Sequence, residues 1–205
     1  MRHQGRDYGQ IQLTRGMQMS QLSIVTGPSR SGKSEWAEQL AIRSPNFVTY
    51  VATAQVDLTD AEWQARILQH QQRRPADWRS LHVPIELSAV ISAATDSEVL
   101  LIDSLGTWLT NLLDVPDDEW QLQQETLCNS LQTAAAEIIL VAEEVGWGVV
   151  PAYPLGRTFR DRLGNLTRRL SAIADATYLV TAGYVLDLHR LGVHLDGWCA
   201  MPENS

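Results

Sequence analysis

The stretch Leu22–Ser34, LSIVTGPSRSGKS, decides the fold class of this 205-residue chain. Its first part, Leu22–Thr26, is a mostly apolar run of the length of a buried strand. The rest, Gly27–Ser34, has the pattern G-x-x-x-x-G-K-S, which forms a loop whose backbone N–H groups surround a phosphate at the start of a helix. The sequence therefore predicts a strand, a phosphate-binding loop and a helix, in that order.

Every residue of this loop is a candidate nucleotide ligand: Gly27, Pro28, Ser29, Arg30, Ser31, Gly32, Lys33 and Ser34. Lys33 is the only lysine in a chain with 15 arginines, which favours a role that needs a compact point charge. We expect Lys33 to reach the β and γ phosphates and to act in catalysis, and the Ser34 hydroxyl to be a Mg²⁺ ligand. The alternative is a Gly/Ser loop that only begins a helix.

Strand-length apolar runs alternate with segments of helical period along the chain. The expected strands are Leu22–Thr26, Phe47–Ala52, Val99–Ile102, Ile138–Ala142 and Tyr178–Thr181. The expected helices are Ser34–Arg43, Asp60–Arg74, Trp108–Leu113, Asp118–Glu137 and Phe159–Ala174. This alternation predicts an α/β fold with a mainly parallel sheet and helices on both faces, in a single domain over residues 21–195. We expect residues 1–20 to be a disordered extension, with Met17 and Met19 as alternative starts, and residues 196–205 to be a tail.

Asp103 ends the buried run Val99–Ile102. A carboxylate at the carboxyl end of a strand is placed to hold the Mg²⁺ of a nucleotide beside a phosphate loop. We therefore expect Asp103 to be a catalytic, nucleotide-binding and metal-binding residue. The alternative is an aspartate that caps the following turn.

A polar stripe on the expected helix Asp60–Arg74 contains His70, with Glu62 and Arg66 at helical spacing before it and Arg73 and Arg74 beyond it. Positive neighbours lower the pKa of an imidazole and keep a nitrogen neutral and nucleophilic. The alternative is an incidental histidine on a solvated helix face, and the spacing alone favours that alternative.

The composition excludes several classes of function. The formal net charge is −8, so we expect no nucleic-acid partner. No apolar run approaches the ~18 residues of a membrane span, and the N-terminal stretch lacks the apolar region of a signal peptide, which predicts a cytoplasmic protein. Two cysteines exclude a disulfide framework.

The order of further segments resembles one enzyme family. The resemblance rests on Gly27–Ser34, Tyr50–Thr53, Arg66–His70, Arg74–Arg79, Leu100–Asp103, Thr110–Leu113, Glu144–Pro151, Phe159–Asp161, Ala174–Asp175 and Leu179–Val180. Over about residues 22–190 the chain is similar to the bifunctional adenosylcobinamide kinase / adenosylcobinamide-phosphate guanylyltransferases of cobalamin synthesis. The segments Glu144–Pro151 and Phe159–Asp161 are the most specific, because generic P-loop kinases lack them.

The resemblance implies two reactions on a RecA-like P-loop NTPase fold. The first phosphorylates the hydroxyl of the aminopropanol arm of adenosylcobinamide with ATP or GTP. The second transfers GMP from GTP to that phosphate through a guanylyl-histidine, and His70 aligns with this histidine. Contacts to the guanine nucleotide fall on Thr53, Ala54, Gln55, Gln71, Gln72, Arg73 and Arg74. The resemblance also implies a homotrimer.

The chain departs from the family pattern at His82, where a Glu is usual, at Thr167-Arg168, where an Asn-Gln pair is usual, and at Val185–His189, in place of a Pro-Leu-x-Leu-Lys ending. These departures leave open the substrate preference and whether both activities are retained. Two alternatives therefore stay open: a P-loop kinase of another small alcohol, and a nucleotide-binding regulatory protein without corrinoid turnover.

A cluster of three arginines has two interpretations. Arg157, Arg160 and Arg162 either bind an anion or form a solvated face.

Overall fold

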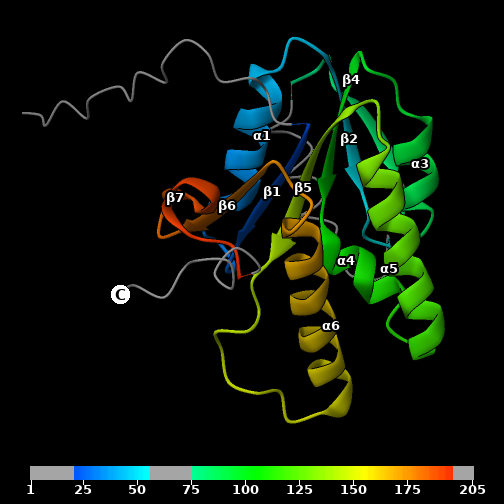
Figure 1. The fold of residues 1–205 in the computed structure, drawn as a ribbon, viewed down its shortest axis with the longest axis vertical. Coiled ribbons are helices and arrows are strands. Elements are labelled where there is room, and N and C mark those ends of the chain that lie inside the picture. Colours follow the sequence, from blue (N-terminus) through cyan, green and yellow to red (C-terminus); the bar gives the residue numbers. More distant parts are fainter. Residues whose placement is uncertain (1–20, 56–74, 196–205) are drawn as a thin grey trace, which may run out of the picture.

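The computed structural model describes residues 21–55 and 75–195 and contains one seven-stranded sheet (Figure 1). Its strands are β1 (Leu22–Gly27), β2 (Phe47–Ala52), β3 (Arg79–His82), β4 (Glu98–Asp103), β5 (Glu137–Glu143), β6 (Ala176–Thr181) and β7 (Tyr184–Asp187). Its helices are α1 (Lys33–Arg43), α3 (Leu87–Ala93), α4 (Leu105–Asn111), α5 (Asp117–Gln132), α6 (Pro154–Ser171) and the short α7 (Leu188–Leu191). The strand order is β3-β2-β4-β5-β1-β6-β7, and only β7 runs antiparallel to its neighbour.

The sequence predicted the buried strands well and the exposed elements poorly. All five expected strands are present, and Phe47–Ala52 has the expected bounds. The edge strands β3 and β7 and the short helix α3 were not predicted. Strand β3 is largely exposed and has no apolar run, and β7 and α3 have only four and seven residues. The expected helix Asp118–Glu137 is wrong at its end, since α5 stops at Gln132 and Glu137 already begins β5. The expected helix Asp60–Arg74 lies wholly outside the described residues.

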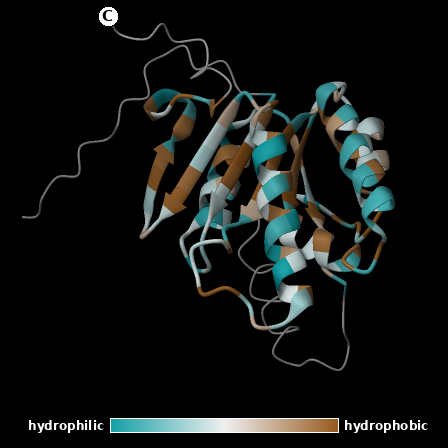
Figure 2. Cartoon of the chain, turned by 60° about the horizontal axis from the view of Figure 1, so that its bottom comes forward, coloured by the Kyte–Doolittle hydropathy of each residue, from teal (hydrophilic) through white to brown (hydrophobic). Residues whose placement is uncertain are grey.

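Helices cover both faces of the sheet, and each face has its own apolar core. Alternate residues of β1 show the division: Ile24 packs in the core under α3, α4, α5 and α6, whereas Val25 packs in the core under α1. Figure 2 shows the central strands as strongly hydrophobic and the helices as mixed. The burial of β1, β4 and β5 on both faces is what parallel strands between two helix layers require. This arrangement confirms the expected α/β class.

The carboxyl ends of the three central strands meet at one edge of the sheet. Gly27 at the end of β1 is paired with Glu143 of β5, and Asp103 at the end of β4 is paired with Val141 of β5. Strand β5 therefore lies between the strand that leads into the phosphate loop and the strand that carries Asp103. Ligands of open α/β sheets bind at this edge.

None of the helices in the described ranges has the length and apolar character that crossing a membrane would need.

Candidate nucleotide and phosphoryl-transfer site

The phosphate loop follows β1 directly and leads into α1. Gly32 is the N-cap of α1, with a φ of 97° that favours glycine, and the Trp36 N–H donates to its carbonyl at 2.9 Å. The Ser31 N–H donates to the Pro28 carbonyl at 3.3 Å, which closes the loop. The first N–H groups of α1 therefore point toward the space that the loop encloses, where they suit an anion.

Glycine is required at the start of the loop. A Cβ on Gly27 would lie 2.1 Å from the Val180 carbonyl oxygen of β6 and 2.8 Å from the Ser31 hydroxyl. The loop thus passes closer to β6 than any side chain permits, which explains the first Gly of the pattern. Lys33 is half-buried, and its Nζ lies 3.4 Å from the Pro28 carbonyl oxygen, so the loop holds the ammonium near its own backbone.

Asp103 does not cap the helix that follows it. Ser104 is the N-cap of α4: its hydroxyl accepts from the Thr107 N–H, in a reciprocal capping box. The Asp103 carboxylate instead accepts a hydrogen bond from the Tyr50 hydroxyl at 3.0 Å. The capping alternative for Asp103 is therefore wrong, and its carboxylate stays half-exposed at the sheet edge.

Glu143 is a site residue that the sequence reasoning missed. Its carboxylate accepts hydrogen bonds from the Ser104 hydroxyl and, at 2.9 Å, from the Gly106 N–H. Burial raises the pKa of the Glu143 carboxyl above its ordinary value, and the negative charge of Asp103 raises it further. The hydrogen bond from Ser104 and the positive charge of Lys33 act in the opposite direction and lower this pKa. Lys33, Asp103 and Glu143 are thus close enough to act on one another electrically. The signal that could have identified Glu143 is its place: like Asp103, it ends a buried apolar run.

The segment Thr53–Gln55 continues from β2 at the same edge. Thr53 is fully buried: its hydroxyl donates to the Ser104 carbonyl at 2.7 Å and accepts from the Ser104 N–H at 2.9 Å. The Thr53 side chain thereby fixes the start of α4, while Gln55 is exposed. His82, one of the departures from the family pattern, has its Nε2 2.6 Å from the Ala54 carbonyl oxygen. This departure therefore lies beside the segment expected to bind the nucleotide.

The remaining expected site residues, His70, Gln71, Gln72, Arg73 and Arg74, lie outside the described residues. Their roles stay predictions.

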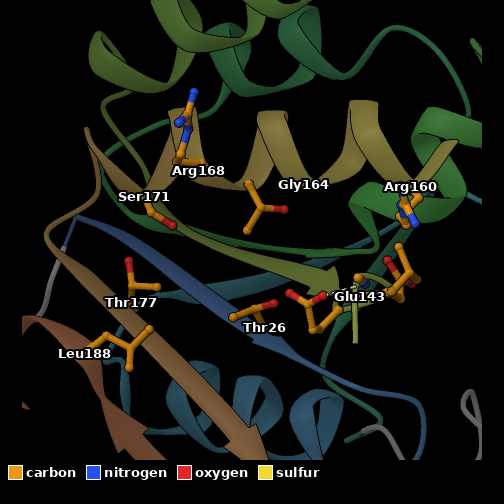
Figure 3. Close-up of a pocket in the computed structure, with 12 residues that line it drawn as sticks. Thr26, Glu143, Arg160, Gly164, Arg168, Ser171, Thr177 and Leu188 are labelled. Atoms are coloured by element: carbon orange, nitrogen blue, oxygen red, sulfur yellow. Dashed lines mark hydrogen bonds between the residues drawn. The ribbon is translucent and has the colours of Figure 1, made fainter. Parts of the chain in front are cut away.

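The three arginines around α6 have different surroundings. Arg157 donates to the Pro151 and Ala152 carbonyls, and Arg162 donates to the carbonyls of Leu112, Leu113 and Val115 and to the Asp117 carboxylate. Both arginines therefore tie loops to the helix. Arg160 pairs with Asp161 at 3.1 Å and lines a cavity together with Glu143 (Figure 3). Of the three, Arg160 is the one that lines this cavity, and whether it binds an anion there stays a prediction.

The donor set at the sheet edge fits Mg²⁺. Asp103 and Ser34 supply a carboxylate and a hydroxyl oxygen, the hard donors that this ion takes alongside water and phosphate oxygens. Over residues 21–55 and 75–195, no group of three or more His, Cys, Asp or Glu side chains could hold a metal without such help. A Mg²⁺ ion held by Asp103 and Ser34 would take its other ligands from water and phosphate oxygens.

Known structures support the fold assignment. A protein from Pyrococcus horikoshii OT3 matches with a TM-score of 0.51 over 83% of this chain and 87% of its own, at 8% sequence identity. The ATPase EscN from the type III secretion system of enteropathogenic E. coli matches with a TM-score of 0.50 over 83% of this chain and 44% of its own, at 12% identity. These likenesses support the expected α/β fold with a mainly parallel sheet, and one of the two neighbours is an ATPase.

Comparison of sequences is more specific. The bifunctional adenosylcobalamin biosynthesis protein CobP of Pseudomonas aeruginosa is 40% identical over 168 residues, which cover 80% of this chain and 95% of the relative. The bifunctional adenosylcobalamin biosynthesis protein CobU of Escherichia coli K12 is 38% identical over 175 residues, covering 78% and 95%. The family model for cobinamide kinase / cobinamide phosphate guanyltransferase matches residues 23–188. With the loop, Asp103 and the strand order in place, the chain belongs to the cobinamide kinase / cobinamide phosphate guanyltransferase family.

Proposed function

We propose that this chain carries out both reactions of its family on adenosylcobinamide. It phosphorylates the terminal hydroxyl of the aminopropanol arm with ATP or GTP, and it then transfers GMP from GTP to the new phosphate, giving adenosylcobinamide-GDP and pyrophosphate. One observation supports this most: the loop Gly27–Ser34 and the carboxylates of Asp103 and Glu143 share one sheet edge in a chain of this family.

In the kinase step the loop binds the triphosphate of the donor through its backbone N–H groups and the start of α1. Lys33 lies against the β and γ phosphates, where its ammonium stabilises the charge that develops during transfer. Ser34 and Asp103 would hold the Mg²⁺ ion, which when bound neutralises phosphate charge and orients the γ-phosphoryl group. The acceptor oxygen forms a bond to the γ-phosphorus while the bond from the γ-phosphorus to the β–γ bridging oxygen breaks, so that the nucleoside diphosphate leaves and the hydroxyl proton is released to water.

In the second step we assign His70 as the nucleophile that takes the guanylyl group. An imidazole nitrogen attacks the α-phosphorus of GTP, pyrophosphate leaves, and the phosphate of the acceptor then displaces the histidine. The segments Thr53–Gln55 and Gln71–Arg74 are the proposed contacts to the guanine nucleotide.

The test uses the purified chain, Mg²⁺ and GTP labelled at the α-phosphate. The wild type should acquire protein-bound label that acid releases and alkali does not, as expected of a phosphoramidate, and His70→Ala should acquire none. His194→Ala, which removes an exposed histidine from the far end of the described chain, is the matched control and should label like the wild type.

Transfer from γ-labelled ATP to adenosylcobinamide tests the kinase step, and Lys33→Ala should abolish it. Phosphorylation without any guanylylated protein would favour a kinase of a small alcohol. Tight nucleotide binding with no corrinoid turnover would favour a regulatory protein.

We further propose that the chain acts in the cytoplasm as a homotrimer. Exposed apolar side chains support self-association: Trp147, Val149 and Val150 between β5 and α6, and Leu191 and Leu195 after β7, are each more than half exposed. Light scattering coupled to size-exclusion chromatography measures the assembly directly. A monomeric mass at micromolar concentration would contradict the trimer.

A further inference from the structure

A cavity of about 260 Å³ lies between α6 and the strands β1 and β6 (Figure 3). One end is formed by Glu143, Glu144, Gly146 and Arg160, next to the phosphate loop, and the other by Ser171 and Thr177. Thr26 forms part of the wall and immediately precedes Gly27, the first residue of the loop. This end of the cavity therefore adjoins the start of the loop, because Glu143 is also paired with Gly27.

Two hydroxyl groups of the cavity wall are buried without a partner. Thr26 is only 8% exposed, and within the described part of the chain neither its Oγ1 nor that of Thr167 has a hydrogen-bond partner. A buried hydroxyl that forms no hydrogen bond lowers the stability of a fold, so it needs an explanation. A ligand in the cavity that pairs with both groups supplies one, once each threonine side chain turns its hydroxyl toward it, because neither oxygen is open to a water-sized molecule in the unliganded fold.

The rest of the wall indicates the chemistry of that ligand. The Thr177 hydroxyl and Ser171 add polar groups at the far end, where His189 Nε2 lies 3.2 Å from the Thr177 hydroxyl. Hydroxyl groups both donate and accept, which suits an amide, and the Arg160 guanidinium at the loop end suits a phosphate. The volume is below the ~300–1,000 Å³ of pockets that bury drug-sized molecules, so it admits a side arm and excludes a large ring.

We propose that this cavity takes the amide-linked alcohol arm of the acceptor, with Thr26 and Thr167 bonded to its polar groups and its terminal oxygen or phosphate at the Arg160 end. This inference rests on the proposed function, which it extends by placing the acceptor. It also gives a role to Thr167, where the chain departs from the family pattern, because a threonine there offers a short hydroxyl to the arm.

The test replaces each hydroxyl by a methyl group of similar size. In Thr26→Val, Thr167→Val and the double variant, the dissociation constant of adenosylcobinamide is measured by equilibrium dialysis, and that of GTP in parallel. We expect acceptor binding to weaken roughly three- to tenfold for each hydroxyl removed, with GTP binding within about twofold of wild type. Thr26→Ser and Thr167→Ser keep the hydroxyl and should bind the acceptor like the wild type.

Thermal unfolding distinguishes a binding role from a structural one. Because neither hydroxyl has a partner in the described fold, the valine variants should unfold at the wild-type temperature or above it. Weakened acceptor binding in variants that are at least as stable supports the inference.

Unchanged acceptor affinity in the double variant would overturn the inference and leave the proposed function standing. A wild type that binds GTP but neither binds nor turns over adenosylcobinamide would overturn both.

Discussion

Gly106 and Glu143 fit each other so closely that one added methyl group should separate them. The ideal Cβ of an alanine at position 106 would lie 2.2 Å from Oε2 and 2.8 Å from Cδ of Glu143. Restoring an ordinary contact of about 3.5 Å moves the carboxylate by more than about 1 Å. That movement breaks the 2.9 Å bond from the Gly106 N–H.

The expected cost of Gly106→Ala follows from three contributions. Overpacking costs about 1–3 kcal/mol, and the lost hydrogen bond to a charged acceptor costs about 1.5–3 kcal/mol when no other bond replaces it. The better helix propensity of alanine returns about 0.5–1 kcal/mol. With partial relaxation of the carboxylate, we expect the free energy of unfolding to fall by about 2 kcal/mol.

Urea unfolding measures this change, and a second glycine provides the control. Gly164 in α6 has nothing within 4 Å of its ideal Cβ, so Gly164→Ala should be neutral or stabilise the protein by up to about 1 kcal/mol. In a Glu143→Ala background the obstacle is gone, and Gly106→Ala should change sign and become neutral or stabilising. If Gly106→Ala costs no more than Gly164→Ala, or costs the same with and without Glu143, the described contact is not what requires glycine there.

Three further outcomes are expected. Burial raises the pKa of Glu143, so the stability that its protonated form contributes is complete below the ordinary value of 4.5 and is lost as the pH rises through the higher folded pKa. Glu143→Gln should remove this part of the pH dependence. If the free energies of unfolding of the two proteins change in parallel from pH 4 to 8, the expectation is contradicted. Arg162→Ala should lower the free energy of unfolding by about 2 kcal/mol, because the guanidinium donates hydrogen bonds to three carbonyls and contacts the Trp120 ring. The control Arg168→Ala, on the exposed face of the same helix, should cost under about 0.5 kcal/mol. Equal losses in the two variants would contradict this account. Burial raises the pKa of the Cys128 thiol, so a thiol reagent at pH 8 should modify Cys128 much more slowly in the native chain than in urea, as peptide mapping would show; similar rates in the two states would refute the burial.

The central fold was predictable because its signals are local and strong. The run Leu22–Thr26 followed by Gly27–Ser34 indicates a strand, a loop and a helix without any tertiary information, and the buried runs before Asp103 and Glu143 indicate strands for the same reason. The exposed edges were not predictable in this way. Strand β3 forms because the backbone of β2 offers it hydrogen bonds, a property of the assembled sheet that the residues Arg79–His82 do not carry themselves.

The position of Lys33 at the start of α1 was predictable because the loop pattern itself fixes it, and its catalytic role stays a prediction. The cradle of Glu143 was not, because it depends on Ser104 and Gly106, nearly forty residues away along the chain and adjacent only after folding. The same holds for Arg160. Its sequence neighbours Arg157 and Arg162 have the same chemistry, and only the direction in which each side chain leaves α6 separates two structural arginines from one that lines the cavity.

The placement of β1 in the middle of the sheet has a consequence for how the chain acquires its structure. β1 is the first strand, yet it pairs only with β5 and β6, with Leu22 opposite Ile138 and Ser23 opposite Ala176. Both partners are synthesised more than a hundred residues later, which at ~5–20 residues per second is a delay of about 6–30 s. Until then the apolar β1 has no sheet to enter, and the phosphate loop at its end has no fixed shape. Nucleotide recognition is therefore one of the last properties that a newly made chain gains, and pairings this distant in sequence should make folding slow for a domain of this size.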